Sequence, residues 1–276
     1  MKTIVTMAAA AVLLSACAAT GMEKADFSDS KAISYADAAR VDRAAERAVA
    51  RPAAGQAVFY FDHEGKLQDK AVSGGFSRKV LGQTQDGLSV VQDFYADGRK
   101  QTNAFVLAKD EKADNFIDTR AQYGVANSYL PSGELAGSRL FRDGRAVQSN
   151  VYRNGKLFIT TFGGKNPDKV TVWYGNGGKN LEMTAADTAQ PAIRLYYENG
   201  QLAAERGIDS QTGETYHSLW TEDGQELNQS APIEQRLQPL LMWLKVIKEI
   251  EKTEYLHQGL LTLPVREEAL PVETKE

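Results

Sequence analysis

The sequence has few of the residues on which disulfide-bonded, metal-binding and nucleic-acid-binding proteins depend. One cysteine in 276 residues excludes an intramolecular disulfide and a cysteine-based zinc site. The three histidines, His63, His217 and His257, are far apart in the chain, so paired metal-ligand spacing is missing. Acidic residues outnumber basic ones by 36 to 32, whereas nucleic-acid-binding proteins usually carry a basic excess. We expect no metal, no cofactor and no nucleic-acid partner.

Catalytic motifs are also missing. The chain contains no Gly-x-Ser-x-Gly nucleophile elbow and no glycine-rich phosphate loop before a helix. Carboxylates are common, and the separation of a catalytic pair cannot be read from a sequence. Glu198, Glu205 and Glu222 lie near turns, where charges usually face solvent. We predict a protein that is not an enzyme, and a hydrolase of envelope glycans stays open as an alternative.

The N-terminus has the features of a secretion signal. Lys2 precedes an apolar run from Ile4 to Leu14, which is shorter than the ~20 residues of a membrane-spanning helix. The run Leu14-Ser15-Ala16-Cys17 resembles the lipobox of bacterial lipoproteins. This resemblance implies that residues 1–16 are removed and that Cys17 carries a covalent lipid, the protein's only non-protein group. Ala18, in place of an aspartate, implies the outer membrane by the same resemblance, with the protein facing the periplasm.

The segment that follows, residues 17–56, is rich in alanine and in charged residues. Alanine and arginine favour helix, but alanine offers little apolar surface to bury. We predict a lipid-anchored, flexible tether that contains one short, weak helix, and this helix is stopped by Arg51-Pro52.

Regularly placed glycines mark residues 57–230 as a β domain. Many follow Asp or Asn, a strong signal for two-residue hairpin turns of type I′. Successive turns are often 11 residues apart, and 22 or 23 where one turn is missing. This period fits a strand of about nine residues plus a turn, and strands joined in this way are antiparallel neighbours. We predict a mainly β fold, an antiparallel β-meander of about 12 strands in one long twisted sheet. The predicted turn glycines are Gly65, Gly87, Gly98, Gly133, Gly144, Gly155, Gly177, Gly200, Gly213 and Gly224.

Aromatic residues precede many of these turns, as in Leu195-Tyr-Tyr-Glu-Asn-Gly-Gln-Leu and Val151-Tyr-Arg-Asn-Gly-Lys-Leu. Together with residues 212–227, these stretches resemble the MORN-variant repeat of the YwqK-type, antitoxin-like family. The resemblance covers residues 60–227 and is poor across 100–128. It implies a repeat fold and supplies no catalytic residues. It also implies an alternative function, that of an antitoxin or immunity protein that neutralises a toxin.

Residues 231–259 change to a helical period. Their apolar residues recur every three or four positions, which predicts an amphipathic helix. They are Ile233, Leu237, Leu240, Leu241, Leu244, Ile247 and Ile250. We expect this stripe to pack on the sheet, with docking to a partner or to the membrane surface as the alternative. Residues 260–276 are predicted to be a disordered, solvated tail.

These features together predict a binding or scaffold module of the bacterial envelope, attached to the membrane by lipid. A long open sheet offers its faces and edges for recognition. The expected partner is a protein, a peptide or a glycan.

Overall fold

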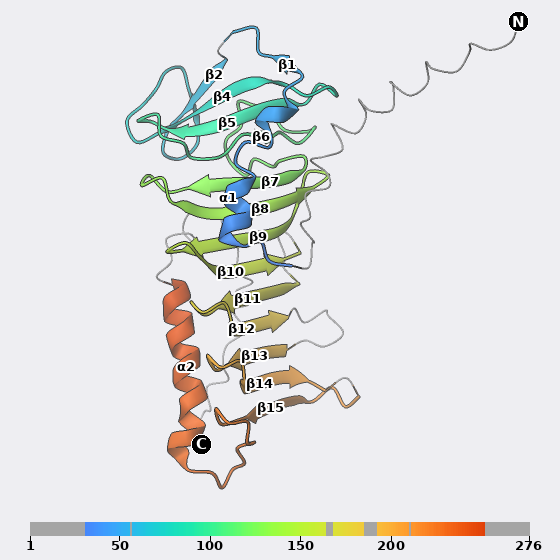
Figure 1. The fold of residues 1–276 in the computed structure, drawn as a ribbon, viewed down its shortest axis with the longest axis vertical. Helices are drawn as coiled ribbons and strands as arrows, with labels where there is room; N and C mark the ends of the chain where they lie inside the picture. The colour runs from blue at the N-terminus through green and yellow to red at the C-terminus, as the bar shows by residue number, and fades with distance from the viewer. Residues whose placement is uncertain (1–30, 56, 164–167, 185–191, 210, 252–276) are drawn as a thin grey trace, which may run out of the picture.

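The computed structural model describes residues 31–55, 57–163, 168–184, 192–209 and 211–251. The predicted signal peptide, the predicted lipid-attachment residue Cys17, residues 252–259 of the predicted helix and the predicted tail 260–276 lie outside these residues. Figure 1 shows antiparallel strands stacked along the long axis of the molecule, with one long helix beside the lower strands.

The fold is mainly β, and the prediction of an antiparallel β-meander followed by a C-terminal helix is confirmed. The first sheet has the order β3-β2-β4-β5-β6, and β1 pairs with β4. Its strands are β1 (Arg51–Pro52), β2 (Val58–Phe61), β3 (Leu67–Gln68), β4 (Phe76–Gln83), β5 (Ser89–Tyr95) and β6 (Phe105–Val106).

The second sheet contains nine strands in sequence order from β7 to β15. They are β7 (Gly124–Tyr129), β8 (Leu135–Arg142), β9 (Arg145–Arg153), β10 (Lys156–Phe162), β11 (Lys169–Trp173), β12 (Lys179–Thr184), β13 (Ala192–Tyr196), β14 (Leu202–Ile208) and β15 (Thr215–Leu219). The strands are therefore divided between two sheets rather than continued in one, and in the first sheet β3 lies outside β2 instead of between β2 and β4. The division falls within residues 100–128, where the match to the repeat is poor. Most of this segment, residues 107–123, forms a loop, and a bridge between Thr102 and Ser128 joins the two sheets.

The ten predicted turn glycines all have positive φ, between +69° and +88°. The residue before the glycine has positive φ only at Asp143 and Asn154, so only these two turns have the expected type I′ geometry. Most of the others resemble the turn at Gly98, whose N–H donates to Tyr95 O while Tyr95 N–H donates to Arg99 O. This pattern is a type I turn followed by a glycine bulge, which also suits the twist of a hairpin.

The aromatic residues before the turns connect one hairpin to the next. The Tyr174 hydroxyl donates to Tyr196 O at 2.6 Å, and the Tyr197 hydroxyl donates to Trp220 O at 2.8 Å. Asn176 and Asn199 donate in the same way to Glu198 O and Glu222 O. Each contact joins residues 22 or 23 positions apart, which explains why this spacing recurs in the sequence.

Residues 33–49, which we call the N-terminal strap, pack against both sheets. They contain α1 (Tyr35–Arg40) and the 3₁₀ turn η1 (Glu46–Ala48). Ile33 and Ala38 are buried in a cluster with residues of β7, β8 and β9, whereas Ala45 is buried against β5 and β6. The prediction of a flexible tether differs from this arrangement. The small alanine side chains let the backbone approach the sheets closely, and contacts with the sheets compensate for a weak helix.

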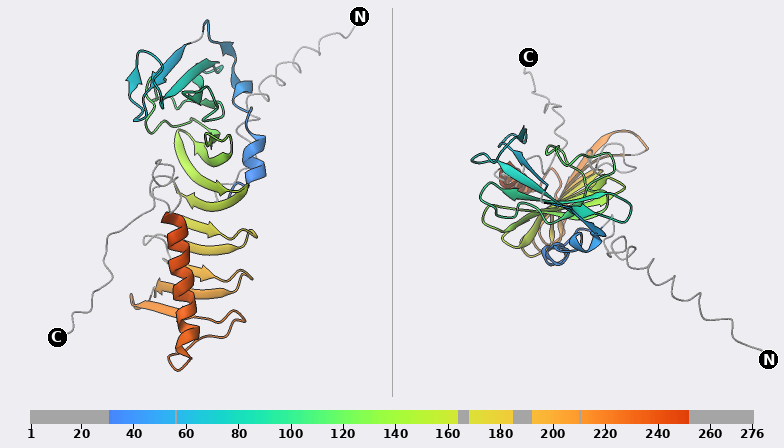
Figure 2. Two further views of the ribbon diagram at one scale, coloured as in Figure 1. Left: turned by 90° about the vertical axis from the view of Figure 1, so that its left-hand side faces the viewer. Right: turned by 90° about the horizontal axis from the view of Figure 1, so that it is seen from above.

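Helix α2 (Ile233–Glu251) runs back along the second sheet (Figure 1), on a different side from α1 (Figure 2). Val246 and Ile250 are buried in the core formed by β9 to β14. Only part of the predicted stripe faces this core. Five of its members are 44–64% exposed, namely Ile233, Leu237, Leu240, Leu241 and Leu244. Within the described ranges, no helix has the length and apolar character needed to cross a membrane.

A candidate binding cavity at the seam between the sheets

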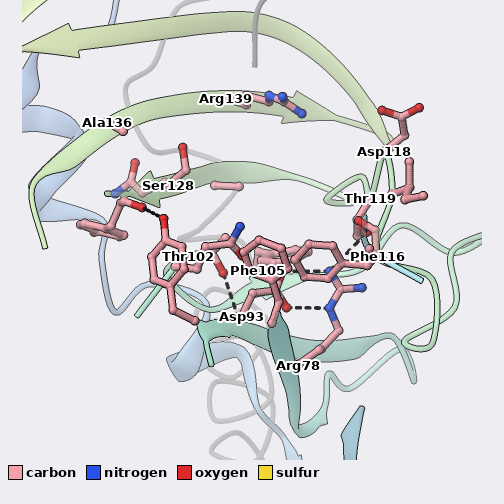
Figure 3. A pocket seen from close by; sticks show the side chains of 18 of the residues that line it. Arg78, Asp93, Thr102, Phe105, Phe116, Asp118, Thr119, Ser128, Ala136 and Arg139 are labelled. Atoms are coloured by element: carbon pink, nitrogen blue, oxygen red, sulfur yellow. Dashed lines mark hydrogen bonds and ion pairs between the residues drawn. The ribbon is translucent and has the colours of Figure 1, made fainter. Parts of the chain in front are cut away.

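A cavity of about 620 Å³ lies where the two sheets meet; we call it the seam cavity. Strands β4, β5 and β6 contribute one wall, β7 and β8 the other, and the loop 107–123 contributes part of the rim. Its aromatic lining residues are Phe76, Tyr95, Phe105, Phe116, Tyr129 and Phe141. In Figure 3, Arg78 and Asp93 lie on the side of the first sheet, and Arg139 lies on the β8 strand opposite.

An ion pair is buried in the first wall. Arg78 and Asp93 are cross-strand partners on β4 and β5 and are 1% and 4% exposed. Arg78 Nε donates to Asp93 Oδ1 at 2.7 Å, and Nη2 donates to Oδ2 at 2.8 Å. This two-point geometry compensates for the removal of both charges from water.

The same guanidinium holds the loop at the rim. Arg78 Nη1 donates to Asn115 O at 2.6 Å, and Nη2 donates to Thr119 Oγ1 at 3.2 Å. The guanidinium carbon also lies 5.4 Å from the centre of the Phe116 ring, within the range of a cation–π contact. Between these contacts, Asp118 takes a φ of +53°, which is uncommon for a residue with a side chain. Arg78 therefore sets the position of the rim.

The cavity presents ring surfaces and polar atoms together. Phe76 stacks on Phe116 with ring centres 4.9 Å apart, and these two rings and Tyr95 are only partly buried. Gln101 Oε1 and Asn127 Oδ1 are buried atoms without a hydrogen-bond partner in the described part of the chain, and both residues line the cavity. A buried acceptor without a donor costs free energy, so a bound group that brought a donor would be favoured.

The charges along the cavity are largely balanced. Burial lowers the pKa of Arg139, and the charge of Asp118 acts in the opposite direction. The Lys66 ammonium holds the pKa of Glu64 below its usual value, and Arg78 neutralises Asp93. The lining therefore has no strong excess of either sign.

Tyr129 links the cavity to the N-terminal strap. It lines the cavity, and its hydroxyl donates to Asp42 of the strap. Lys100 Nζ contacts the same carboxylate at 2.7 Å and lies 3.8 Å from the centre of the Tyr129 ring. Burial and the neighbouring Asp42 raise the pKa of Tyr129, so its hydroxyl stays protonated as a donor.

Of the residues singled out in the sequence, His63 and Gly65 line the seam cavity; the other nine turn glycines do not. Sequence reasoning missed Arg78, Asp93, Gln101 and Arg139. The signal that could have found the region is the poor repeat match across 100–128, because a repeat is interrupted where another demand acts on the chain. The carboxylates Glu198, Glu205 and Glu222 lie on the second sheet, away from the cavity.

Two of the carboxylates that line the cavity are poorly suited to general acid catalysis. Asp93 is committed to Arg78 through two hydrogen bonds, and the lowered pKa of Glu64 is the opposite of what a general acid needs. Among the described residues, no cluster of three or more His, Cys, Asp or Glu side chains could hold a metal ion.

No protein-family model matches the chain, and no curated protein matches it. Solved structures with partial similarity to it include TarM, which is 10% identical over 55% of this chain and 24% of its own, with a TM-score of 0.21. A mutant of S. aureus TarM, in complex with Fondaparinux, alpha-GlcNAc-glycerol and UDP, is 8% identical over 46% and 22%, with a TM-score of 0.21. The GtfA/B complex bound to UDP and GlcNAc is 12% identical over 58% and 25%, with a TM-score of 0.19. The chain thus spans a quarter or less of these proteins, and TM-scores this low indicate neither a shared fold nor a shared function.

Proposed function

We propose that this protein is a non-enzymatic binding module of the bacterial envelope, anchored in the outer membrane through Cys17, and that the seam cavity holds its ligand. The observation that carries the proposal is the cavity itself. It combines aromatic rings with a small number of polar groups, the usual composition of a ligand site, and two of its buried oxygens have no partner among the described residues.

Rigid support favours the same interpretation. The Arg78 guanidinium fixes the loop at the rim, and Tyr129 is held from behind by Asp42 of the N-terminal strap. Side chains held in this way lose little freedom when a ligand binds, which favours affinity. The strap, which follows the proposed anchor residue Cys17 in the sequence, packs against both sheets.

The test is a substitution that fills the cavity with a larger side chain. Ala126 on β7 and Ala146 on β9 are both partly buried at the edge of one apolar cluster, and only Ala126 lines the cavity. The Cys17→Ser form of the full chain is incubated with small-molecule extracts of envelopes and examined by native mass spectrometry. We expect the parent and its Ala146→Phe variant to retain a ligand that the Ala126→Phe variant loses. Equal retention by both variants, or no retained ligand at all, contradicts the proposal.

A further inference from the structure

The geometry points to an uncharged carbohydrate as the ligand of the seam cavity. This inference rests on the proposed binding function and adds the chemical class of the ligand. Three properties of the lining carry it: the balance of charge, the hydrogen-bonding character of its polar side chains, and the partly exposed rings beside them.

The balance of charge argues against a strongly ionic ligand. Arg78 and Asp93 neutralise one another through two short hydrogen bonds, and the charge of Glu64 is offset by its contact with Lys66. Arg139 and Asp118 both line the cavity and offset one another. A ligand with several charges of one sign would meet as much repulsion as attraction, and its desolvation would not be compensated.

The polar groups favour a ligand that can both donate and accept hydrogen bonds. Gln101 lines the cavity, its Oε1 has no donor in the described part of the chain, and the terminal torsion of a glutamine side chain is soft enough to let the amide reorient toward a ligand. Arg139 on the opposite wall offers only donors. Sugar hydroxyls satisfy both demands, because each can donate one hydrogen bond and accept others.

The aromatic rings of the lining favour a ligand that has C–H groups next to its hydroxyls. Phe76, Tyr95 and Phe116 line the cavity and keep part of their surface exposed. Aromatic faces carry partial negative charge and attract the weakly positive hydrogens of aliphatic C–H bonds. A pyranose ring presents an apolar C–H face and a hydroxyl rim within one rigid unit, whereas an aliphatic ligand would leave Gln101 without a donor.

The shape indicates more than one sugar unit. The volume of about 620 Å³ is in the range of sites for drug-sized molecules. A second hollow of about 700 Å³ shares Phe76, Tyr95 and Pro131 with the seam cavity, so the two adjoin. Asp97 and Arg99 extend the polar lining into this second hollow. A disaccharide or longer glycan can thus leave the seam cavity past Tyr95.

Ligand-detected NMR with the Cys17→Ser full chain tests the class of ligand. The neutral probes are cellobiose, maltose and N,N′-diacetylchitobiose, and the charged comparison is a hexuronic acid disaccharide. We expect at least one neutral probe to show saturation transfer from the protein and to bind at least tenfold more tightly than the charged one. Gln101→Met keeps the side-chain shape and removes the acceptor, so it should weaken binding about tenfold.

Gln83→Met on β4 is the matched control, because the Gln83 side chain is exposed and lies outside the cavity, and it should bind like the parent. Circular dichroism of each variant verifies folding, and Ala126→Phe provides a second way to block the cavity. The inference is overturned if no neutral probe binds, or if binding survives both Gln101→Met and Ala126→Phe. If envelope extracts still supply a ligand in that case, the binding function stands and the carbohydrate class falls; if they supply none, both fall.

Discussion

The Arg78–Asp93 pair is the single contact on which the geometry of the seam cavity depends most. Arg78→Met leaves the Asp93 carboxylate buried without its partner and removes the contacts to Asn115 and Thr119. We expect a loss of about 3–5 kcal/mol in the free energy of unfolding, the usual effect of breaking a buried pair. Urea denaturation measures it, and limited proteolysis should show faster cleavage within residues 107–123.

The exposed Asp97–Arg99 pair provides the control, because its side chains are 48% and 57% exposed. Arg99→Met should change stability far less than Arg78→Met, because solvent screens an exposed pair. Replacing both members of the buried pair, as Arg78→Met with Asp93→Leu, should recover much of the lost stability, since no uncompensated charge remains. Equal effects of Arg78→Met and Arg99→Met would refute a special role for the buried pair.

Glu182 on β12 gives the second sheet a pH dependence. Burial raises the pKa of its carboxyl, but the ammonium groups of Lys179 and Lys169, 2.8 and 2.9 Å from Oε2, outweigh burial and lower it. A lowered folded-state pKa adds stability above the unfolded-state value, and this stability is lost as the pH falls through the folded-state value. Glu182→Gln should therefore cost about 1 kcal/mol at pH 7 and flatten the decline below about pH 4.5.

Thermal denaturation at several pH values measures this dependence for Glu182→Gln and for Glu214→Gln, an exposed carboxylate before β15. Parallel stability curves for the parent and Glu182→Gln would show that the two lysines do not stabilise the charged form.

Cys17 decides the proposed location of the protein. Acyl chains on this residue would hold the protein in the membrane fraction, so Cys17→Ser should move it to the soluble fraction of lysed cells. Metabolic labelling with a fatty acid should mark the parent and not the variant. A Cys17→Ser protein that still sediments with membranes would mean that another feature attaches it.

At the scale of elements, the stacked hairpins are joined by the hydroxyls of Tyr174 and Tyr197. Burial raises the pKa of Tyr174 to about 12, so this hydroxyl remains a donor at physiological pH. Tyr174→Phe and Tyr197→Phe should each lower the free energy of unfolding by about 1 kcal/mol, because Tyr196 O and Trp220 O lose a donor. Tyr216→Phe, on the edge strand β15, should have little effect in the same urea titrations; a similar loss there would argue against the ladder.

The strands and turns could be predicted because their cause is local. A glycine at positive φ sets a turn, and the distance to the next such glycine sets the strand. The side of α2 that meets the sheet could not be predicted, since Leu240, Leu241 and Leu244 are as apolar as Val246 and Ile250, which are buried. The choice between these two faces depends on contacts with strands more than 30 residues away in the chain. The packing of the strap could not be predicted for the same reason. Ala38 is buried by contacts with the second sheet, and the neighbouring residues in the sequence do not indicate these contacts.

At the scale of the whole molecule, the seam cavity was beyond sequence reasoning for a related reason. Its walls come from β4, β5, β7 and β8, and its unpartnered atoms are identified only when the distances are known. Gln101 and Arg139 are ordinary polar residues in the sequence. They line one cavity because the two sheets come into contact there, and the repeat pattern does not predict this contact.

The N-terminal strap should make the two sheets unfold as one unit. Ala38 is fully buried on the second sheet, and Ala45 is buried on the first, so Ala38→Glu should detach the strap from only one of them. The three tryptophans, Trp173, Trp220 and Trp243, report the second sheet and α2 alone, whereas circular dichroism reports both sheets. In the parent, the two signals should change at the same urea concentration, as expected of a cooperative transition.

In the Ala38→Glu variant, the tryptophan signal should change at a lower urea concentration than the circular dichroism signal, because the second sheet loses the contact that couples it to the first. Ala39→Glu places the same charge on the exposed side of α1 and should leave the two transitions coincident. If the transitions stay coincident in both variants, contacts such as the bridge between Thr102 and Ser128 are sufficient to couple the sheets. The strap would then not be needed to couple the two sheets.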